Sequence, residues 1–299
     1  MIIIRSNDCV SRKEWTMRRI ILSTESGADI PKDLVEKYQI QVVPMHVIMD
    51  GRDYLDGEIS VEEVFNYHNT TKKIPSTSAT NVQEYHDLFK KIRVDFPDSI
   101  IIHIGYTSKA SASYQSALIA AEDFEDIFLV DALNVTGGLA AVVMYAATLL
   151  EEEPSIDHVQ LIEKIESIVP KTKLAFLPGS LDFLRAGGRV SNIAYIGGAL
   201  LKIKPCIELK EGKLVSTKKY RGNMSNVAEK LMRDYLNEYN IDRKQLYLIY
   251  SIGLDESIKN RIDEVVKEAG FENVKWMQAG AMISTHAGPG GFGIAGIEK

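Results

Sequence analysis

Hydrophobic and polar positions follow two periods along the first half of the chain. Short runs of β-branched residues predict strands, and the amphipathic stretches between them predict helices. The strands are expected at 20–23, 42–49, 100–104 and 127–130. The helices are expected at 32–38, 61–69, 81–94 and 114–124. Strands that alternate with helices are typical of βαβ units, so this half predicts a mainly parallel sheet with flanking helices.

The second half has a different pattern, which indicates a mixed sheet. A hairpin is predicted at 205–216, with its turn at Glu211-Gly212, and a helix at 225–239. A strand at 246–251 and a helix at 257–269 follow. The glycine-rich tail lets the backbone pass close to a ligand or turn sharply before a final strand. The fold class predicted for the whole chain is therefore α/β, with two domains.

Two polar breaks divide the chain. The segment 151–155 reads Glu-Glu-Glu-Pro-Ser, and Pro170 closes the amphipathic stretch that follows it. We place the domain boundary there, with an N-terminal α/β domain at 17–169 and a C-terminal mixed-sheet α/β domain at 170–299. Residues 1–16 precede the first predicted strand, and we expect them to be an extension without fixed structure.

The segment 132–150 carries no charge over 19 residues, which is close to the length that spans a bilayer. It also contains Asn134, Thr136 and Thr148, and it opens like a loop that enters a helix. We interpret it as a buried core helix. The N-terminus lacks the basic and apolar regions of a secretory signal.

Composition narrows the range of partners. Charged residues make up 25% of the chain, its net charge is −6, and no basic run is long enough to follow a nucleic acid backbone. Two distant cysteines and six histidines without ligand spacing argue against disulfides and against a metal site. The chain lacks a P-loop, and the GxGxxG pattern at 288–293 lies too close to the C-terminus for a dinucleotide fold. We expect a cytoplasmic protein with no metal, no cofactor and no nucleic acid partner.

Two hydroxyl-rich loops are candidates for an anion site. They contain Ser76, Thr77, Ser78 and Thr80, and Thr107, Ser108, Ser111 and Ser113. Both loops precede a predicted helix, where unpaired amides favour an anion, although Ser and Thr at such positions also serve as simple helix caps. His286 stands directly before the glycine run, which makes it a further candidate for a ligand contact.

Arg185 and Arg189 flank a Gly-rich segment, Ala186-Gly187-Gly188, which we expect to be too flexible for a helix interior. Their guanidinium groups are candidates for contact with a phosphate or an acidic partner, and solvated surface arginines are an equally good interpretation.

Several motifs in a fixed order resemble the DegV family along nearly the whole chain from Met17. Residues 25–31 resemble the opening DS-x-x-DLP, with Glu25 in place of the usual Asp. The other segments are similar to V-P-L, Y-x-D-G, T-S-Q-P-S, S-S-x-L-S-G-T-Y-Q-S-A, G-G-R-I-S and H-T-G-P-G, and they lie at 43–45, 54–57, 76–80, 107–117, 187–191 and 286–290.

The resemblance implies a DegV-like fold with a fatty acid in a buried tunnel between the two domains. It implies that the carboxylate contacts are Thr77, Ser108 and His286, with Ser78, Ser111 and Gly288 in support. It further implies that the bound long-chain fatty acid is presented to the catalytic subunit of a fatty acid kinase, which forms an acyl phosphate with ATP. Arg185 and Arg189 are then candidates for contact with the kinase or its phosphate, and transient peripheral contact with a membrane is compatible with a lipid cargo.

A serine esterase that acts on acyl chains is the main alternative. Ser108, Asp131 and His286 occur in the chain order of an α/β-hydrolase triad. That fold class requires a G-x-S-x-G elbow, whereas the residues around Ser108 read Tyr-Thr-Ser-Lys-Ala. A lipid sensor without a kinase partner is a further alternative. The favoured interpretation is a carrier without catalytic residues of its own.

Overall fold

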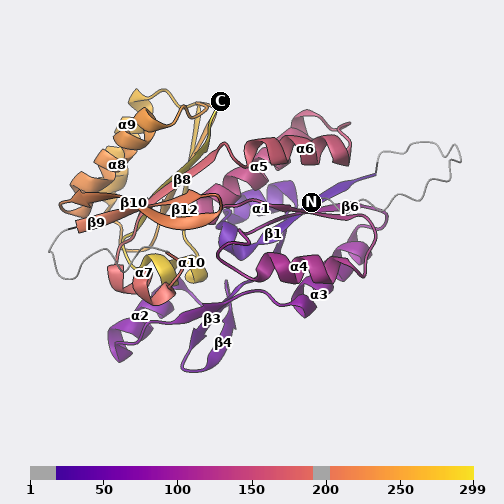
Figure 1. The fold of residues 1–299 in the computed structure, drawn as a ribbon, viewed down its shortest axis with the longest axis horizontal. Helices are drawn as coiled ribbons and strands as arrows, with labels where there is room; N and C mark the ends of the chain where they lie inside the picture. The colour runs from indigo at the N-terminus through magenta and orange to yellow at the C-terminus, as the bar shows by residue number, and fades with distance from the viewer. Residues whose placement is uncertain (1–17, 191–202) are drawn as a thin grey trace, which may run out of the picture.

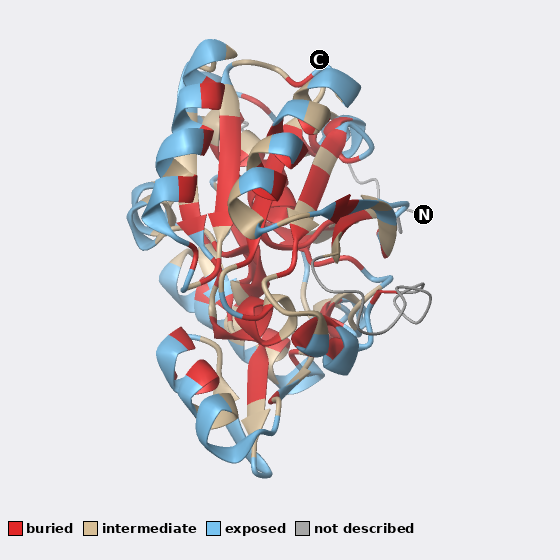
Figure 2. Cartoon of the chain, turned by 90° about the vertical axis from the view of Figure 1, so that its left-hand side faces the viewer, coloured by how far each residue is buried: buried red, intermediate tan, exposed pale blue. Residues whose placement is uncertain are grey.

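The computed structural model describes residues 18–190 and 203–299, and these form three sheets with helices around and between them (Figure 1). The predicted extension at 1–16 and the end of the Gly-Gly-Arg motif at Ser191 lie outside the described residues. Strand residues are mostly buried, and the exposed residues follow the outer faces of the helices (Figure 2). The α/β fold class predicted from the sequence is confirmed.

A four-stranded parallel sheet forms the centre of the N-terminal half. Its order is β2-β1-β6-β7, with bounds Gln41–Val43, Ile20–Glu25, Ile100–Gly105 and Ile127–Asp131. Alternate residues face opposite sides of a strand. Ile21 and Ile101 therefore pack against α3 (Val82–Asp95) and α4 (Ser113–Ala121), whereas Leu22 faces the helix on the other side.

The predicted strand at 42–49 is wrong, because the chain changes sheets within it. β2 ends at Val43, and β3 (His46–Met49) pairs antiparallel with β4 (Arg52–Leu55) and with β5 (Ser76–Ser78) in a separate three-stranded sheet. Pro44 lies between β2 and β3, and its missing N–H cannot continue a ladder.

A six-stranded mixed sheet contains the named strands that follow the predicted domain boundary within the described residues. Its order is β10-β9-β8-β13-β11-β12, and only β11 and β12 are parallel. The helices α8 (Met224–Glu238) and α9 (Glu256–Glu268) cover one face. The bounds of the strands, in sheet order, are Lys213–Arg221, Ile203–Lys210, Thr172–Leu177, Phe292–Ile297, Gln245–Tyr250 and Asn273–Gln278.

Helix α5 (Thr136–Glu152) lies between the two large sheets. It contacts β1 and β6 on one side, and β8, β11 and β13 on the other. A helix that is buried on both sides must be apolar around its circumference, which explains the uncharged run in the sequence. No helix among the described residues is long and apolar enough to cross a membrane. The interpretation of this segment as a core helix is confirmed.

Three short helices join the small sheet to the rest of the molecule. Helix α10 (Ala281–Ala287) contacts α7 (Leu181–Gly187), α2 (Val61–Thr71), β3 and β5. The sequence did not predict α7 or α10. Both helices end at their glycine runs, with Gly188 as the C-cap of α7 and Gly288 as the C-cap of α10, and the glycine-rich tail turns before β13 as expected. The remaining helical elements are η1, α1 and α6, with bounds Ser26–Ala28, Lys32–Tyr38 and His158–Ile168.

Gly179 lies where two loops cross beside α7 and α10. Its N–H donates to the Ala287 carbonyl at 2.8 Å. A β-carbon at Gly179 would lie 1.9 Å from the carbonyl oxygen of Pro289 and 2.8 Å from the amide nitrogen of Gly291. Because these neighbours are backbone atoms, the crossing cannot relax by a change of rotamer.

Gly179→Ala should therefore lower the free energy of unfolding by roughly 2–4 kcal/mol, as overpacking against rigid atoms does. Gly51→Ala is the matched control, because a β-carbon there meets nothing within 4 Å and the backbone φ of 78° alone opposes it. The control should cost about 1 kcal/mol. Urea unfolding measures both values, and equal losses would contradict the close crossing.

Candidate functional site

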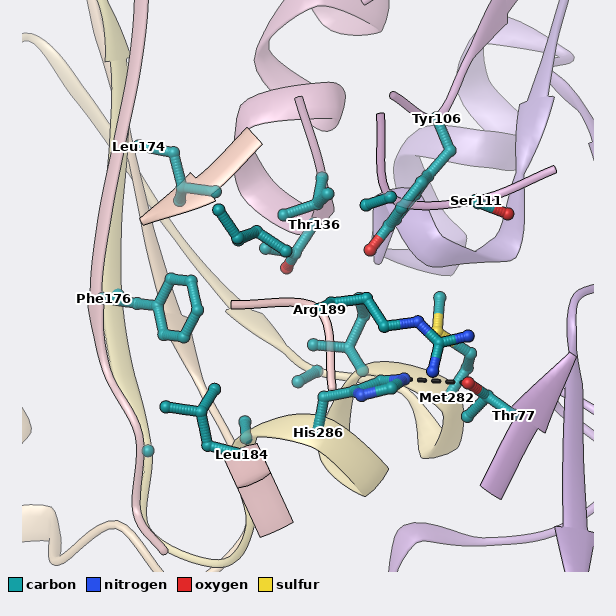
Figure 3. A pocket seen from close by; sticks show the side chains of 18 of the residues that line it. Thr77, Tyr106, Ser111, Thr136, Leu174, Phe176, Leu184, Arg189, Met282 and His286 are labelled. Atoms are coloured by element: carbon teal, nitrogen blue, oxygen red, sulfur yellow. Dashed lines mark hydrogen bonds between the residues drawn. The ribbon is translucent and has the colours of Figure 1, made fainter. Parts of the chain in front are cut away.

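A cavity of about 520 Å³ lies between the small sheet, the β6–α4 loop and the six-stranded sheet. Figure 3 shows its two contrasting sides. Hydroxyl, imidazole and guanidinium groups gather at one end, and aliphatic and aromatic side chains line the other. A ligand that fills this space must itself have a polar end and an apolar body.

Thr77 and His286 meet at the polar end. The Thr77 hydroxyl lies 2.8 Å from His286 Nε2, although 209 residues separate them in the sequence. Thr77 is the central residue of β5, and His286 lies in the last turn of α10. The contact of α10 with β5 and β3 brings the two residues together.

The imidazole of His286 is held in a tight space. Gly187 at the end of α7 lies against the ring, and a β-carbon there would be 2.2 Å from Nδ1. Burial lowers the pKa of His286 to about 4, and the positive charge of Arg189 acts in the same direction. The ring is therefore neutral at pH 7, so it can donate through only one of its nitrogens.

The second hydroxyl-rich loop is linked to the first. The Thr80 N–H donates to Ser113 Oγ at 3.2 Å, and Ser113 Oγ lies 3.0 Å from Ser111 Oγ. Thr107 is fully buried, and its hydroxyl donates to the Gly212 carbonyl at the tip of the β9–β10 hairpin. The loop is thus fixed at both ends.

Ser78, Ser108 and Ser111 all line the cavity, so the structure brings them to the same space as Thr77 and His286. Ser108 is exposed, and its N–H donates to the Asp131 carboxylate at 3.3 Å. This leaves the Ser108 side chain at the rim of the cavity.

Arg189 also lines the cavity, and its guanidinium lies beside Thr77 and His286 (Figure 3). Arg185 lies 3.9 Å from Asp182 on α7 and is not among the lining residues. Gly288 does not line the cavity either. It turns the chain with φ of 69°, and a β-carbon there would lie 2.6 Å from the Ser180 β-carbon, so its role in the structure is to let two loops pack closely.

The apolar end was not found by sequence reasoning. Leu174 and Phe176 on β8 and Ile249 on β11 line it, from the face of the six-stranded sheet opposite α8 and α9. The Tyr106 hydroxyl points into the space between the two ends (Figure 3). The alternation of β8, in which Leu174 and Phe176 share a face, was the available signal, but the strand was not predicted.

The geometry does not assemble a serine esterase triad from the described residues. A triad requires the His to bond the Ser hydroxyl through one nitrogen and the Asp through the other. His286 Nε2 instead bonds Thr77, and its Nδ1 faces Gly187. The Asp131 carboxylate accepts backbone N–H groups of Ser108 and Leu133.

Metal ligands do not converge at this site. Across 18–190 and 203–299, no group of three or more His, Cys, Asp and Glu side chains is arranged to hold a metal ion.

Residues 19–299 match a family model described as "Uncharacterised protein, DegV family". The chain belongs to the DegV family. A DegV domain-containing protein of Caldanaerobacter subterraneus is 32% identical over 288 residues, which cover 95% of this DegV chain and 100% of the relative.

Two solved structures are similar to this DegV protein along most of its length. A fatty-acid-binding DegV family protein of Thermus thermophilus is 26% identical, with a TM-score of 0.84, and the match covers 94% of this chain and 100% of the other. A stearic acid-binding protein of Eubacterium ventriosum is 26% identical, with a TM-score of 0.81 and coverage of 95% and 99%. Both of these similar proteins are described as binding fatty acids.

The lowered pKa of His286 predicts a pH dependence of stability. Between pH 4 and 6.5 the unfolded chain binds a proton at this residue and the folded chain does not, so the folded state loses stability as the pH falls through this window. Relative to His286→Gln, the wild type should gain up to ~3 kcal/mol in unfolding free energy from pH 4 to 6.5 and nothing above. Urea unfolding at several pH values measures this difference, and parallel profiles for the two proteins would refute it.

Proposed function

We propose that this chain is a cytoplasmic carrier that encloses a long-chain fatty acid in the cavity. The carboxylate would lie at Thr77, Ser108 and His286, and the acyl chain would run toward Leu174 and Phe176. The observation that carries the proposal is a single cavity that is polar at one end and apolar at the other. Fatty acid binding by the similar proteins of Thermus thermophilus and Eubacterium ventriosum supports it.

The apolar wall would supply most of the affinity. At ~0.8 kcal/mol per buried methylene, a tail of about 14 methylenes gains on the order of 11 kcal/mol before ordering costs. A hydrogen bond to a charged carboxylate adds roughly 1.5–3 kcal/mol at best. The polar groups therefore orient the head group and offset the cost of removing its charge from water.

The charges at the polar end fit a carboxylate. Arg189 supplies a cation beside the neutral His286, and the hydroxyls of Thr77 and Ser108 supply donors without adding charge. Ser78 and Ser111 line the same end and would support the head group.

The bound carboxylate would be presented to a partner. Ser108 and Lys109 are exposed at the polar end, so the head group lies close to the surface. We propose that the partner is a fatty acid kinase that converts the bound acid to an acyl phosphate with ATP. Arg185 and Arg189 are both exposed, in and directly after α7, and would contact the kinase or its phosphate. Loading would require at most transient, peripheral contact with a membrane.

Protein purified under native conditions should carry a fatty acid. Native mass spectrometry should show the mass of the chain with one long-chain fatty acid, and the delipidated protein should take up palmitic acid again at one molecule per chain. A protein that carries no lipid and does not bind added fatty acid would overturn the proposal.

Thr77→Ala and Ser108→Ala should reduce acyl phosphate formation more than they reduce lipid binding. We expect a loss of tenfold or more in kinase turnover with less than about a tenfold increase in the Kd for palmitic acid, because the tail carries most of the affinity. The Kd is measured by displacement of a fluorescent fatty acid, and turnover by ATP consumption with a bacterial fatty acid kinase.

Ser76→Ala is the matched control. Ser76 lies on the same strand as Thr77, is exposed, and does not line the cavity. This variant should leave both quantities unchanged. Equal losses of binding and turnover in Thr77→Ala would show that the head group, not the tail, carries the affinity.

A further inference from the structure

The helix that carries His286 is capped by residues from the other half of the chain. The N-cap residue of α10 is Gly280, which has no side chain to satisfy the first amides of the helix. The Gly280 N–H instead donates to Asp29 Oδ1 at 2.7 Å, and the Met282 N–H donates to Asp56 Oδ1 at 3.1 Å. Two carboxyl groups, 251 and 226 residues away in the sequence, therefore fix the start of α10.

The fit around this helix end is close. A β-carbon at Gly280 would lie 3.2 Å from Asp29 Oδ1 and 3.3 Å from Asp56 Oδ1, so a larger residue would displace the carboxyl groups. Asp29 is buried, with 9% of its surface exposed. The absence of a side chain at Gly280 thus allows both acids to reach the amides of α10.

Asp29 also contacts the wall of the cavity. Its Oδ2 lies 2.5 Å from the hydroxyl of Thr136, a residue that lines the cavity. Thr136 has a φ of 40°, which is strained for a β-branched residue. The bond to Asp29 therefore helps to hold Thr136 in a conformation that it would otherwise avoid, and it links the cavity wall to the start of α10.

His286 lies at the other end of α10, and its position determines the contact with Thr77. The helix has seven residues, and His286 lies in its last turn, about 9 Å along the axis from Gly280. The imidazole has little freedom, because Gly187 meets one side of the ring and Thr77 bonds Nε2. A shift of the helix start therefore moves the imidazole against fixed neighbours.

We propose that Asp29 and Asp56 are positioning residues for head-group recognition, which hold His286 at Thr77 by capping α10 from the N-terminal half. This inference rests on the proposed fatty acid function of the cavity. The two acids do not touch the head group. They set the place of the imidazole that does.

The protonation state of Asp29 supports a cap that is mainly steric and hydrogen-bonded. Burial raises the pKa of Asp29 to about 8, and the charge of Asp56 acts in the same direction. Burial also raises the pKa of Asp56. At neutral pH Asp29 is mostly a neutral acid, so an asparagine resembles it in shape and retains an acceptor for the Gly280 N–H.

A simple tether between the two halves is the competing explanation, and the chain provides a matched control for it. Asp33 on α1 pairs with Lys275 on β12 at 2.7 Å, and both side chains are exposed. This pair also joins the N-terminal and C-terminal halves, and its bond involves neither α10 nor His286. Asp33→Asn therefore removes a link between the halves without changing the position of His286.

The test compares the Kd for palmitic acid with the Kd for hexadecanol, whose head group is neutral. In Asp29→Leu and Asp56→Leu we expect the Kd for the acid to rise about tenfold, because a charge-assisted hydrogen bond is lost, and the Kd for the alcohol to stay within about twofold. In Asp29→Asn the Kd for palmitic acid should return to within about threefold of the wild-type value. Asp33→Asn should leave the ratio of the two Kd values unchanged.

Two outcomes would overturn the inference. If Asp29→Leu and Asp56→Leu fold and keep the wild-type ratio of Kd values, the acids do not position the head-group site. If the Kd values for both ligands rise by the same factor, the two acids have only a structural role. Should Asp29→Leu fail to fold, Asp56→Ala and Thr136→Val test the same connection with smaller changes, and the same rise in the Kd for the acid relative to the alcohol is expected.

A second readout separates this inference from the proposed function. The ring resonances of His286, observed by NMR in the ligand-free protein, should shift in Asp29→Leu and stay unchanged in Asp33→Asn. If the wild type binds no fatty acid, the proposed function fails while these resonances still decide whether the acids position the imidazole. Unchanged His286 resonances in Asp29→Leu would then refute the positioning role.

Discussion

The burial of α5 between the two large sheets is the interaction on which the rest of the structure depends. Without its uncharged buried surface, β8, β11 and β13 would not pack opposite β1 and β6, and the cavity would have no second wall. The contact is close: a β-carbon at Gly137 would lie 2.4 Å from the end of Ile249, a residue that lines the cavity. Because protein interiors are densely packed, this contact fixes the position of α5 relative to the part of β11 that lines the cavity.

Helix α10 joins this frame to the polar end of the cavity. It receives its caps from the N-terminal half, contacts α2 and α7 along its length, and presents His286 to Thr77. None of these partners is near it in the sequence. The polar end is therefore complete only when the C-terminal helix has docked on the small sheet, which couples assembly of the site to assembly of the fold.

Sequence patterns predicted the long periodic helices and strands and missed the short elements. Strands β1, β6 and β7 of the parallel sheet and the helices α1 to α5, α8 and α9 were predicted from their apolar patterns. The small sheet was missed because β4 and β5 have four and three residues, too few to show a period. Motif resemblance selected Thr77 and His286, but their hydrogen bond spans 209 residues and no local pattern encodes it. The domain boundary at 169/170 stays a prediction.

The two halves of the chain supply different parts of the cavity wall, and this affects how the ligand specificity of the cavity can change. Leu174, Phe176 and Ile249 stand on strands whose opposite face is fixed by α8 and α9, whereas Thr77, Ser108 and Ser111 stand on the N-terminal half. Substitutions of the apolar wall therefore fall on a different part of the chain from substitutions of the hydroxyl groups. Separate mutations can change the fit of a ligand's apolar body and the hydroxyl contacts of its polar end, whereas His286 belongs to the polar end but lies on the C-terminal half.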